Sequence, residues 1–425
     1  MSDHLPQDLL IDILTRLPAE SLVRLTPVSK SWHSLITSPK FISRHLLRTA
    51  SNPDNDRLLV RYRTDEPKRD HYSLVVDGKD SFHLLKTLDL PVGAFESLGY
   101  SVVGSCNGVI CLSDDQEYGY TDDMFLWNPS IRKFFAIPRY NVTFQSHGPF
   151  MHCVGFGYDP VTDDFKVVRV VHTGVDCDRI PPEVEIYTLK TGRWRYISDK
   201  ALPVKIMERY RQAYFNGAAH WMAFTRGPFR HTILAFNMSE EVFNEIFVPE
   251  SITHDVSLYN KITLSVFKES LCLIQCVYRN DRHCSVWIMK EYGVAASWAN
   301  LFRIDLCGGL SRPLGLRKSG EVIFATDDGN LVSCDHQTKH ITYVGICGKF
   351  GDGFSHIFYP DSYTESLELL NVLESSENEV VSGQKEEEKE GGGGKQEEAK
   401  GSSLLRAGYH LLSPNRPPNG YLLDF

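Results

Sequence analysis

The 425-residue sequence lacks any run of eighteen apolar residues, so we expect no helix that crosses a membrane. The amino-terminal residues also lack a basic stretch followed by a long apolar run, so we expect no secretory signal. The 45 lysines and arginines are outnumbered by 54 aspartates and glutamates, giving a formal net charge of −9. That balance disfavours nucleic acid as a partner. These absences favour a protein of the cytoplasm and/or nucleus with no membrane partner.

The sequence has ten cysteines but lacks the paired ligand spacing of a typical metal site. Most lie in apolar, strand-like runs, and without a secretory signal they are expected to be reduced core residues. Cys272 and Cys276, with His283 and Cys284 downstream, could supply zinc ligands. However, on a strand this spacing directs both sulfurs to one face of the core. It also differs from a typical structural zinc site, whose ligands come as two closely spaced pairs. The sequence therefore predicts no metal site.

Catalytic signatures are also lacking. No H-E-x-x-H, G-x-S-x-G or G-x-G-x-x-G motif stands in a suitable strand-to-helix context. The run Gly391–Lys395 resembles part of a phosphate-binding loop but lacks the leading glycine, the following Ser or Thr and a preceding strand. The other candidates for acid–base chemistry stand in strand or turn contexts typical of structural residues: Asp114, Asp115, Asp327, Asp328, His152 and His220. We expect no catalytic residue and no cofactor.

The first thirty-six residues, in contrast, are rich in apolar side chains. Leucines and isoleucines in residues 5–18 recur at spacings of three and four, which predicts a helix that begins near Pro6 and ends at Pro18. Residues 21–25 and 28–36 suggest two further short helices, and Lys40 to Leu47 a fourth. Three short helices in about forty residues rarely support a core of their own. Because apolar residues fall on several faces of the first helix, we expect this segment to bind a partner.

The residue pattern of the sequence changes at Arg57. From there, short runs of Val, Ile, Phe, Tyr and Trp alternate with turns that contain Gly, Asn, Asp and Pro, a pattern typical of an all-β domain. One hairpin pattern recurs, with an aromatic residue on each side of a polar turn. Its copies are Trp127–Phe134, Tyr158–Phe165, Tyr187–Trp194 and Phe236–Phe243, with a weaker copy at Asp335–Ile341.

A second hairpin pattern recurs at steps of roughly 50 residues, the length of a kelch-type propeller blade. Five units are visible. We expect a sixth to be shared between the two ends of the domain, with strands near 58–62 and 72–76 and a carboxy-terminal strand within 356–370. Such closure removes free sheet edges. An irregular β-sandwich with similar hairpins is the alternative interpretation.

The end of the chain, from Glu374 to Ser403, consists mainly of Glu, Lys, Gly, Ser and Gln, a composition typical of disorder. The expected fold is thus a small all-α module followed by a large all-β domain, β-propeller-like with about six blades, and a disordered acidic tail. The boundaries that we expect are a helical module at 1–48, a linker at 49–56, a β-domain at 57–372, a disordered segment at 373–403 and a tail at 404–425.

The helical module resembles an F-box. The pattern L-P-x-D-L-x-x-x-I-L-x-R-L-P, followed by S-L-x-R-L and V-S-K-S-W-x-x-L-I, matches that family at about a dozen positions. The resemblance implies docking on the Skp adaptor of a Skp–cullin–F-box (SCF) ubiquitin ligase, and through it on cullin. It also implies the adaptor-binding residues Leu5, Pro6, Leu9, Leu10, Ile13, Leu14, Leu17, Pro18, Leu22, Val28, Trp32, Leu35 and Ile36. A small helical cap packed on the next domain is the alternative.

The β-domain resembles the F-box-associated (FBA, kelch-like) domain of plant F-box proteins. The pieces that match begin with Ser105-Cys-Asn-Gly, Trp127-Asn-Pro-Ser, Gly155-Phe-Gly-Tyr-Asp-Pro and Asn216-Gly-x-x-His-Trp. The spaced glycine pairs and Tyr/Trp of a true kelch repeat are not regularly present, so FBA is the preferred identification. In that family the domain recruits a substrate protein.

The resemblance implies a non-catalytic substrate receptor that recruits a target protein for ubiquitination and degradation. The alternative is a propeller that binds a small ligand or glycan, or a propeller enzyme, with an accessory F-box. A convergent polar pocket at a propeller mouth would favour that alternative. Because loops vary without disturbing sheet cores, we expect the substrate, whose identity is unknown, to bind the connections Tyr140–Pro149, Thr173–Pro182 and Thr225–His231.

Overall fold

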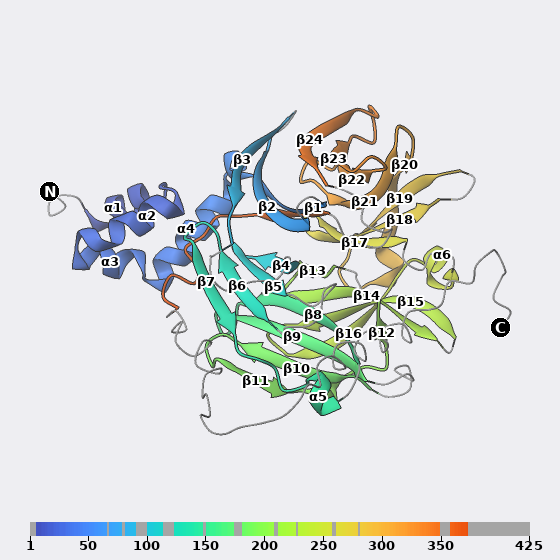
Figure 1. Cartoon of the computed structure of the whole chain (residues 1–425), viewed down its shortest axis with the longest axis horizontal. Coiled ribbons are helices and arrows are strands. Elements are labelled where there is room, and N and C mark those ends of the chain that lie inside the picture. The colour runs from blue at the N-terminus through green and yellow to red at the C-terminus, as the bar shows by residue number, and fades with distance from the viewer. Residues whose placement is uncertain are drawn as a thin grey trace, which may run out of the picture.

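The computed structural model describes residues 6–65, 68–78, 81–90, 100–113, 123–147, 150–173, 181–207, 211–226, 228–256, 261–278, 281–348 and 358–372. In these residues a helical module lies beside a large all-β domain (Figure 1). The elements of the module are α1 (Gln7–Leu14), α2 (Ala19–Leu25), the 3-10 turn η2 (Thr26–Val28), α3 (Lys30–Ile36) and α4 (Pro39–Ser51). Among the described helices none is long and apolar enough to span a membrane.

Proline and serine residues set the helix boundaries. Pro6 and Pro18 immediately precede α1 and α2. The Ser29 hydroxyl accepts a hydrogen bond from the Trp32 amide at 3.2 Å, and Ser38 caps α4 in the same way. The predicted fourth helix is confirmed but is longer than expected, because α4 ends at Ser51. The expected linker is therefore mostly the last turn of α4 and the 3-10 turn η3 (Pro53–Asn55).

The β-domain contains, in the described residues, six antiparallel sheets arranged as the blades of a propeller (Figure 1). This confirms the predicted fold class. Blade 1 is β25 (Phe358–Tyr363), β1 (Arg57–Asp65), β2 (Lys68–Asp77) and β3 (Phe82–Leu88). Blade 2 is β4 (Ser101–Cys106), β5 (Val109–Ser113), β6 (Met124–Asn128) and β7 (Lys133–Ile137). Blade 3 is β8 (Phe150–Asp159), β9 (Asp164–Thr173), β10 (Glu183–Thr188) and β11 (Arg193–Tyr196).

The other three blades follow in chain order. Blade 4 is β12 (Lys205–Ile206), β13 (Ala213–Phe215), β14 (Ala218–Arg226), β15 (Phe229–Asn237) and β16 (Val242–Phe247). Blade 5 is β17 (Ile262–Phe267), β18 (Ser270–Val277), β19 (His283–Met289) and β20 (Trp298–Asp305). Blade 6 is β21 (Leu310–Leu316), β22 (Val322–Thr326), β23 (Asn330–Cys334) and β24 (Ile341–Cys347). Short helices α5 (Phe144–His147) and α6 (Glu250–Thr253) lie between strands.

The ring closes through blade 1, as the sequence predicted. Strand β25 pairs with β1 over a register that runs from Arg57 opposite Tyr363 to Tyr62 opposite Phe358. This pairing joins the last described strand to the first. Pro360 is tolerated in β25 because this is the innermost strand of its blade, so one of its edges faces the central channel.

The four recurring aromatic hairpins join adjacent strands in blades 2, 3 and 4, with two of the hairpins in blade 3. The register places Trp127 opposite Phe134, and Tyr158 opposite Phe165. In the other two hairpins, the partners across the strands are Tyr187 with Trp194 and Phe236 with Phe243. The predicted pattern is thus confirmed in its register. Between neighbouring blades lie apolar clusters such as the one around Phe156, Val167 and Leu126. Burial of these side chains is the main stabilising term.

The strand order divides the connections between two faces. Neighbouring strands in each blade are antiparallel, so successive connections alternate between the ends of the blade. One face carries residues 107–108, the β6–β7 turn and the segment 364–372 that follows β25. We call it the helix-bearing face, because Ile131 and Leu367 on it pack against the helical module. The ends of β7, β9 and β14 lie on the opposite face, so the three predicted substrate-binding segments begin there.

The prediction that the cysteines are reduced core residues is wrong for one pair. Cys276 and Cys284 form a disulfide, because they lie opposite each other on β18 and β19 with their Cα atoms 4.2 Å apart. Cys307 and Cys347 carry free thiols but are exposed, and Cys177 lies outside the described residues. The other free cysteines are Cys106, Cys111, Cys153, Cys272 and Cys334.

We predict that the propeller loses stability in mild acid because of His172. Its side chain is 2% exposed, neither ring nitrogen has a hydrogen-bond partner in the described part of the chain, and burial lowers its pKa to about 4. A histidine pKa below its unfolded value of about 6.5 stabilises the fold above pH 6.5, and that stability is lost as pH falls toward 4. The free energy of unfolding of His172→Leu, relative to that of wild type, should be about 2 kcal/mol higher at pH 5 than at pH 7.

Thermal unfolding of both proteins at pH 5 and pH 7 measures this difference. His340→Leu is the matched control, because His340 is an exposed turn residue. If His172→Leu and wild type lose stability in parallel between pH 7 and pH 5, His172 is not the group that titrates.

Candidate functional site

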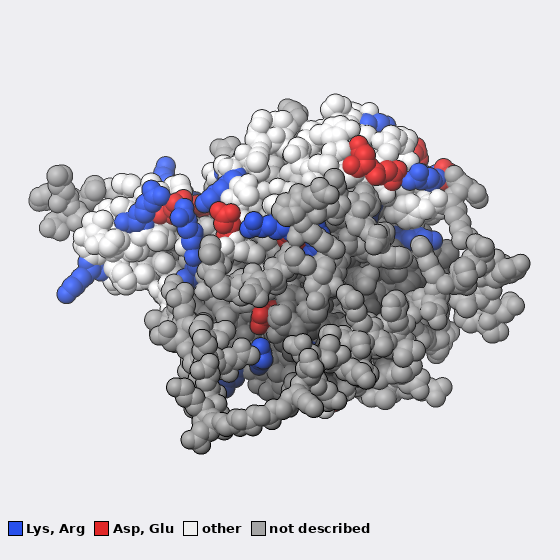
Figure 2. Space-filling view, viewed as in Figure 1, with Lys and Arg blue, Asp and Glu red and all other residues white. Residues whose placement is uncertain are grey.

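The helical module leaves an apolar surface uncovered. Leu9 and Ile13 are 54% and 49% exposed although they belong to an otherwise well-packed module, and Val28 on η2 is 61% exposed. Leu9 and Ile13 are one turn apart on α1, so they lie on the same face of that helix. Figure 2 shows the module as mainly uncharged surface bordered by basic side chains. Exposed apolar residues grouped in this way are typical of a protein-binding surface.

The structure divides the predicted adaptor-binding residues into three groups. Leu14, Leu22 and Ile36 are buried in the core of the module, so for these three the prediction of a surface role is corrected. They instead hold the helices together beneath the surface. Leu5 lies outside the described residues. The remaining nine are exposed or half-buried and are available to a partner: Pro6, Leu9, Leu10, Ile13, Leu17, Pro18, Val28, Trp32 and Leu35.

The module is fixed to the propeller by the segment that follows β25. Leu367 is fully buried in the same apolar cluster as Leu14, Leu22 and Ile36, and Ile131 of the β6–β7 turn packs against that cluster. In Figure 1 the orange-red chain beyond β25 runs to the helices. The core of the helical module is therefore completed by residues of the β-domain, which makes the two parts one packed unit.

Hydrogen bonds fix the same joint. The Glu365 carboxylate accepts a hydrogen bond at 2.8 Å from the Ala19 amide in the first turn of α2. Since α2 is preceded by Pro18 and has no side-chain cap of its own, Glu365 acts as its cap. Asn371 donates from its side-chain amide to the Thr37 carbonyl oxygen at 2.6 Å. These contacts join positions more than three hundred residues apart.

Asn128 anchors the joint to blade 2. Its side-chain amide nitrogen lies 3.1 Å from the Ser366 carbonyl oxygen and 2.8 Å from the Glu368 carbonyl oxygen. The side chain is completely buried. Asn128 belongs to the Trp127-Asn-Pro-Ser motif, so the sequence marked it, but the pattern gave no sign of its partners. Sequence reasoning therefore missed the joint although it found one of the residues that build it.

The predicted substrate-binding segments differ in form. The first, Tyr140–Pro149, begins on a buried framework, because the Arg169 guanidinium is 3.1 Å from the Glu185 carboxylate and stacks 3.5 Å from the Tyr140 ring. Glu185 also accepts from the Asn141 amide at 2.9 Å. These contacts fix residues 140–142 and leave the exposed part of the segment to residues beyond them.

The second segment, Thr173–Pro182, lies largely outside the described residues. For the third, Thr225–His231, the prediction of a long connection is wrong. Strands β14 and β15 pair as far as Arg226 opposite Phe229, leaving a tight turn. Arg230 there stacks over Phe247 at 4.7 Å and lies 2.8 Å from the Glu245 carboxylate.

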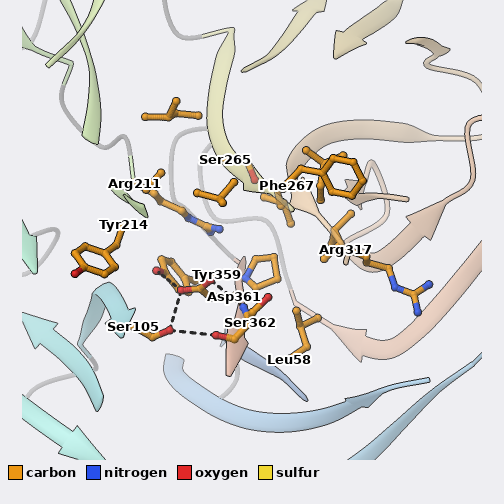
Figure 3. A pocket seen from close by; sticks show the side chains of 18 of the residues that line it. Leu58, Ser105, Arg211, Tyr214, Ser265, Phe267, Arg317, Tyr359, Asp361 and Ser362 are labelled. Atoms are coloured by element: carbon orange, nitrogen blue, oxygen red, sulfur yellow. Dashed lines mark hydrogen bonds between the residues drawn. The ribbon is translucent and has the colours of Figure 1, made fainter. Parts of the chain in front are cut away.

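The propeller also contains a pocket in its central channel, lined by both polar and apolar side chains, a feature that the sequence left open. It has a volume of about 520 Å³ and is bounded by the inner strands β4, β13, β17, β21 and β25 (Figure 3). Ser105 donates to the Asp361 carboxylate at 3.0 Å and lies 3.2 Å from the Ser362 carbonyl oxygen. Burial raises the pKa of Asp361.

The residues considered for metal or acid–base chemistry have structural contacts. His220 lies 3.1 Å from the Ala213 carbonyl oxygen and 2.8 Å from the Tyr292 hydroxyl. The Thr326 hydroxyl and the Asn330 amide lower the pKa of Asp328 in its turn, while Asp114 and Asp115 lie outside the described residues. Within the described ranges, no three His, Cys, Asp or Glu side chains gather closely enough to hold a metal ion.

Comparison with known proteins assigns both parts of the chain. Residues 69–369 match the F-box associated beta propeller domain, and residues 2–44 match the F-box domain. The chain is 29% identical over 370 residues to the F-box protein CPR1 of Arabidopsis thaliana, covering 80% of this chain and 84% of that protein. It is 28% identical to the F-box protein At3g07870 of the same plant, covering 83% and 88%.

Solved structures resemble the propeller only distantly. An oligogalacturonate lyase in complex with manganese has a TM-score of 0.38 and 8% identity, covering 71% of this chain and 82% of that one. A dipeptidyl peptidase 4 of Porphyromonas gingivalis has a TM-score of 0.33 and 12% identity, covering 68% and 53%.

The F-box match supports binding to a Skp-type adaptor of an SCF complex, the partner that suits the apolar surface on α1 and η2. The propeller match extends over most of the β-domain and includes Glu365 and Leu367 of the joint. The helical module and the six blades of the described residues agree with these two matches. The chain belongs to the family of plant F-box proteins with an F-box associated beta propeller domain.

Proposed function

We propose that the chain is the substrate receptor of an SCF-type ubiquitin ligase and recruits a target protein for ubiquitination and degradation. The observation that carries this proposal is the packed joint between the helical module and the propeller. A receptor without chemistry of its own acts by holding substrate lysines near a charged conjugating enzyme, so its two binding surfaces must keep a fixed relative position.

The two surfaces are well separated in this arrangement. The module contacts the helix-bearing face of the propeller, through Ile131 and Leu367. The β7–β8 connection belongs to the opposite face, and the Arg169–Glu185 pair fixes its residues 140–142, beyond which its exposed part begins. A substrate bound there leaves α1 free for the adaptor. Through the adaptor, we propose, the chain is joined to cullin. Because the SCF complex and the target protein must be in the same compartment, we propose that the chain acts in the cytoplasm and/or nucleus.

The adaptor surface is tested by the double variant Leu9→Asp, Ile13→Asp. Both side chains are half exposed, so the charges should leave the fold intact, whereas adaptor binding would bury them unpaired. We expect adaptor affinity to fall by at least about 30-fold, the effect of losing a hot spot worth 2 kcal/mol. Calorimetry with a purified Skp-type adaptor measures it.

Val161→Asp provides the matched control, since Val161 is 81% exposed on a propeller turn. Equal thermal stability of the two proteins shows that the module remains folded. Unchanged adaptor affinity in the folded double variant would contradict the proposed surface.

The joint is tested by Glu365→Ala, which removes the cap of α2 and should cost about 1 kcal/mol of local stability. Amide hydrogen exchange in α2 should speed up by about fivefold, while affinity for the adaptor falls little. Ubiquitin transfer to a bound substrate should slow, because the module and the propeller no longer keep one orientation. Glu240→Ala, at an exposed turn, is the control. Faster exchange with undiminished transfer would show that fixed orientation is not required.

The substrate face is tested by replacing residues 143–149 with a Gly-Ser linker while keeping the anchored residues 140–142. Affinity purification of the Leu9→Asp, Ile13→Asp protein from plant cells with the proteasome inhibited should enrich the substrate, because bound substrate is no longer ubiquitinated. The 143–149 replacement should lose most of this capture at unchanged thermal stability. The same replacement at 336–339, a turn on the helix-bearing face, should retain it. The opposite outcome would place recognition on the helix-bearing face.

A further inference from the structure

The central channel is lined by inner strands from most of the ring. Contacts run from β25 to β4, from β13 to β17 and from β17 to β21, so the strands surround one axis. Their side chains bound the 520 Å³ cavity, which is within the range of pockets that hold small molecules. The cavity is a property of the closed ring, since Tyr359 and Asp361 of β25 form one of its walls.

Arg211, which lies just before β13, extends its guanidinium into this cavity (Figure 3). The guanidinium carbon is 4.4 Å from the centre of the Tyr359 ring. Both terminal nitrogens are buried, and neither has a hydrogen-bond partner among the residues that the structure describes. Burial lowers the pKa of Arg211 to about 9. Leaving a buried guanidinium without acceptors is costly, so the site is chemically incomplete.

The surroundings define the ligand that would complete it. Lys268 stands exposed at the rim, and the other basic side chains of the lining, Arg317 and Lys318, are paired with acidic residues outside it. The acidic side chain of the lining, Asp361, accepts hydrogen bonds from Ser105, from the Tyr359 hydroxyl and from the Ser362 amide. Its carboxylate attracts the Arg211 guanidinium without a hydrogen bond to it. Positive charge therefore predominates. The remaining wall is largely apolar and includes Leu264, Val266, Phe267, Leu314 and Leu316.

We infer that the channel binds a small organic acid, with its carboxylate on the terminal nitrogens of Arg211 and its apolar body against the wall formed by β17 and β21. The forked guanidinium matches a carboxylate with two parallel hydrogen bonds. The apolar wall distinguishes such a ligand from a bare inorganic anion. This site is separate from the adaptor surface and from the opposite face of the propeller, so it goes beyond the receptor function.

Calorimetry on the full chain with butanoate, hexanoate and octanoate tests the inference. Each added methylene should raise the affinity about fourfold if the chain is buried against the apolar wall. Arg211→Met should reduce octanoate affinity at least tenfold, and Arg211→Lys should retain more of it than Arg211→Met. Octanol, which lacks the charge, should bind as weakly to wild type as octanoate binds to Arg211→Met.

A second measurement separates a ligand site from a structural role. Without ligand, Arg211→Met should raise the melting temperature, because a buried cation without acceptors is removed. Octanoate should raise the melting temperature of wild type and leave that of Arg211→Met unchanged. The inference is overturned if affinity does not increase with chain length, if phosphate binds as tightly as octanoate, if Arg211→Met binds octanoate like wild type, or if that variant is less stable than wild type.

Discussion

The pairing of β25 with β1 is the constraint on which the rest of the structure depends. This short ladder joins Phe358–Tyr363 to the beginning of the β-domain and closes the ring. An open propeller would expose the free edges of two inner strands, and backbone groups there would be available for pairing with other chains. The pairing also has a high sequence separation, so the entropy of closing the chain between Arg57 and Tyr363 must be offset before it forms.

The same strand serves two further parts of the molecule. Tyr359 and Asp361 line the central channel, where the Tyr359 ring supports the Arg211 guanidinium. Immediately after the strand, the chain supplies Glu365 to cap α2 and Leu367 to complete the core of the helical module. Blade 1, the channel and the joint are therefore not independent features. Each requires β25 to be in register with β1, since a slip of one residue would turn Tyr359 and Asp361 away from the channel.

The sequence predicted the elements better than the contacts between them. The aromatic hairpins were recognised because a turn and its two flanking residues are local, and the register confirms them as direct partners across the strands. The joint could not be predicted, because Glu365 and Ala19 meet only once the ring has closed. Burial of Leu14, Leu22 and Ile36 was missed for a related reason: the helical spacing shows that a residue is apolar but not which face another element covers. The Cys276–Cys284 disulfide depends on a hairpin register that composition does not define.

Arg211 gave no sequence signal, since it follows no motif and precedes a strand of three residues. Its position matters because a ligand held by this residue would contact the closed ring and not the unfolded chain. Binding of that kind stabilises the closed state by an amount that grows with the ratio of ligand concentration to Kd. Because β25 forms one wall of the channel and continues into the joint, the stabilisation would extend to the residues that hold the helical module. Channel and joint are thus linked by a continuous backbone and not merely by proximity.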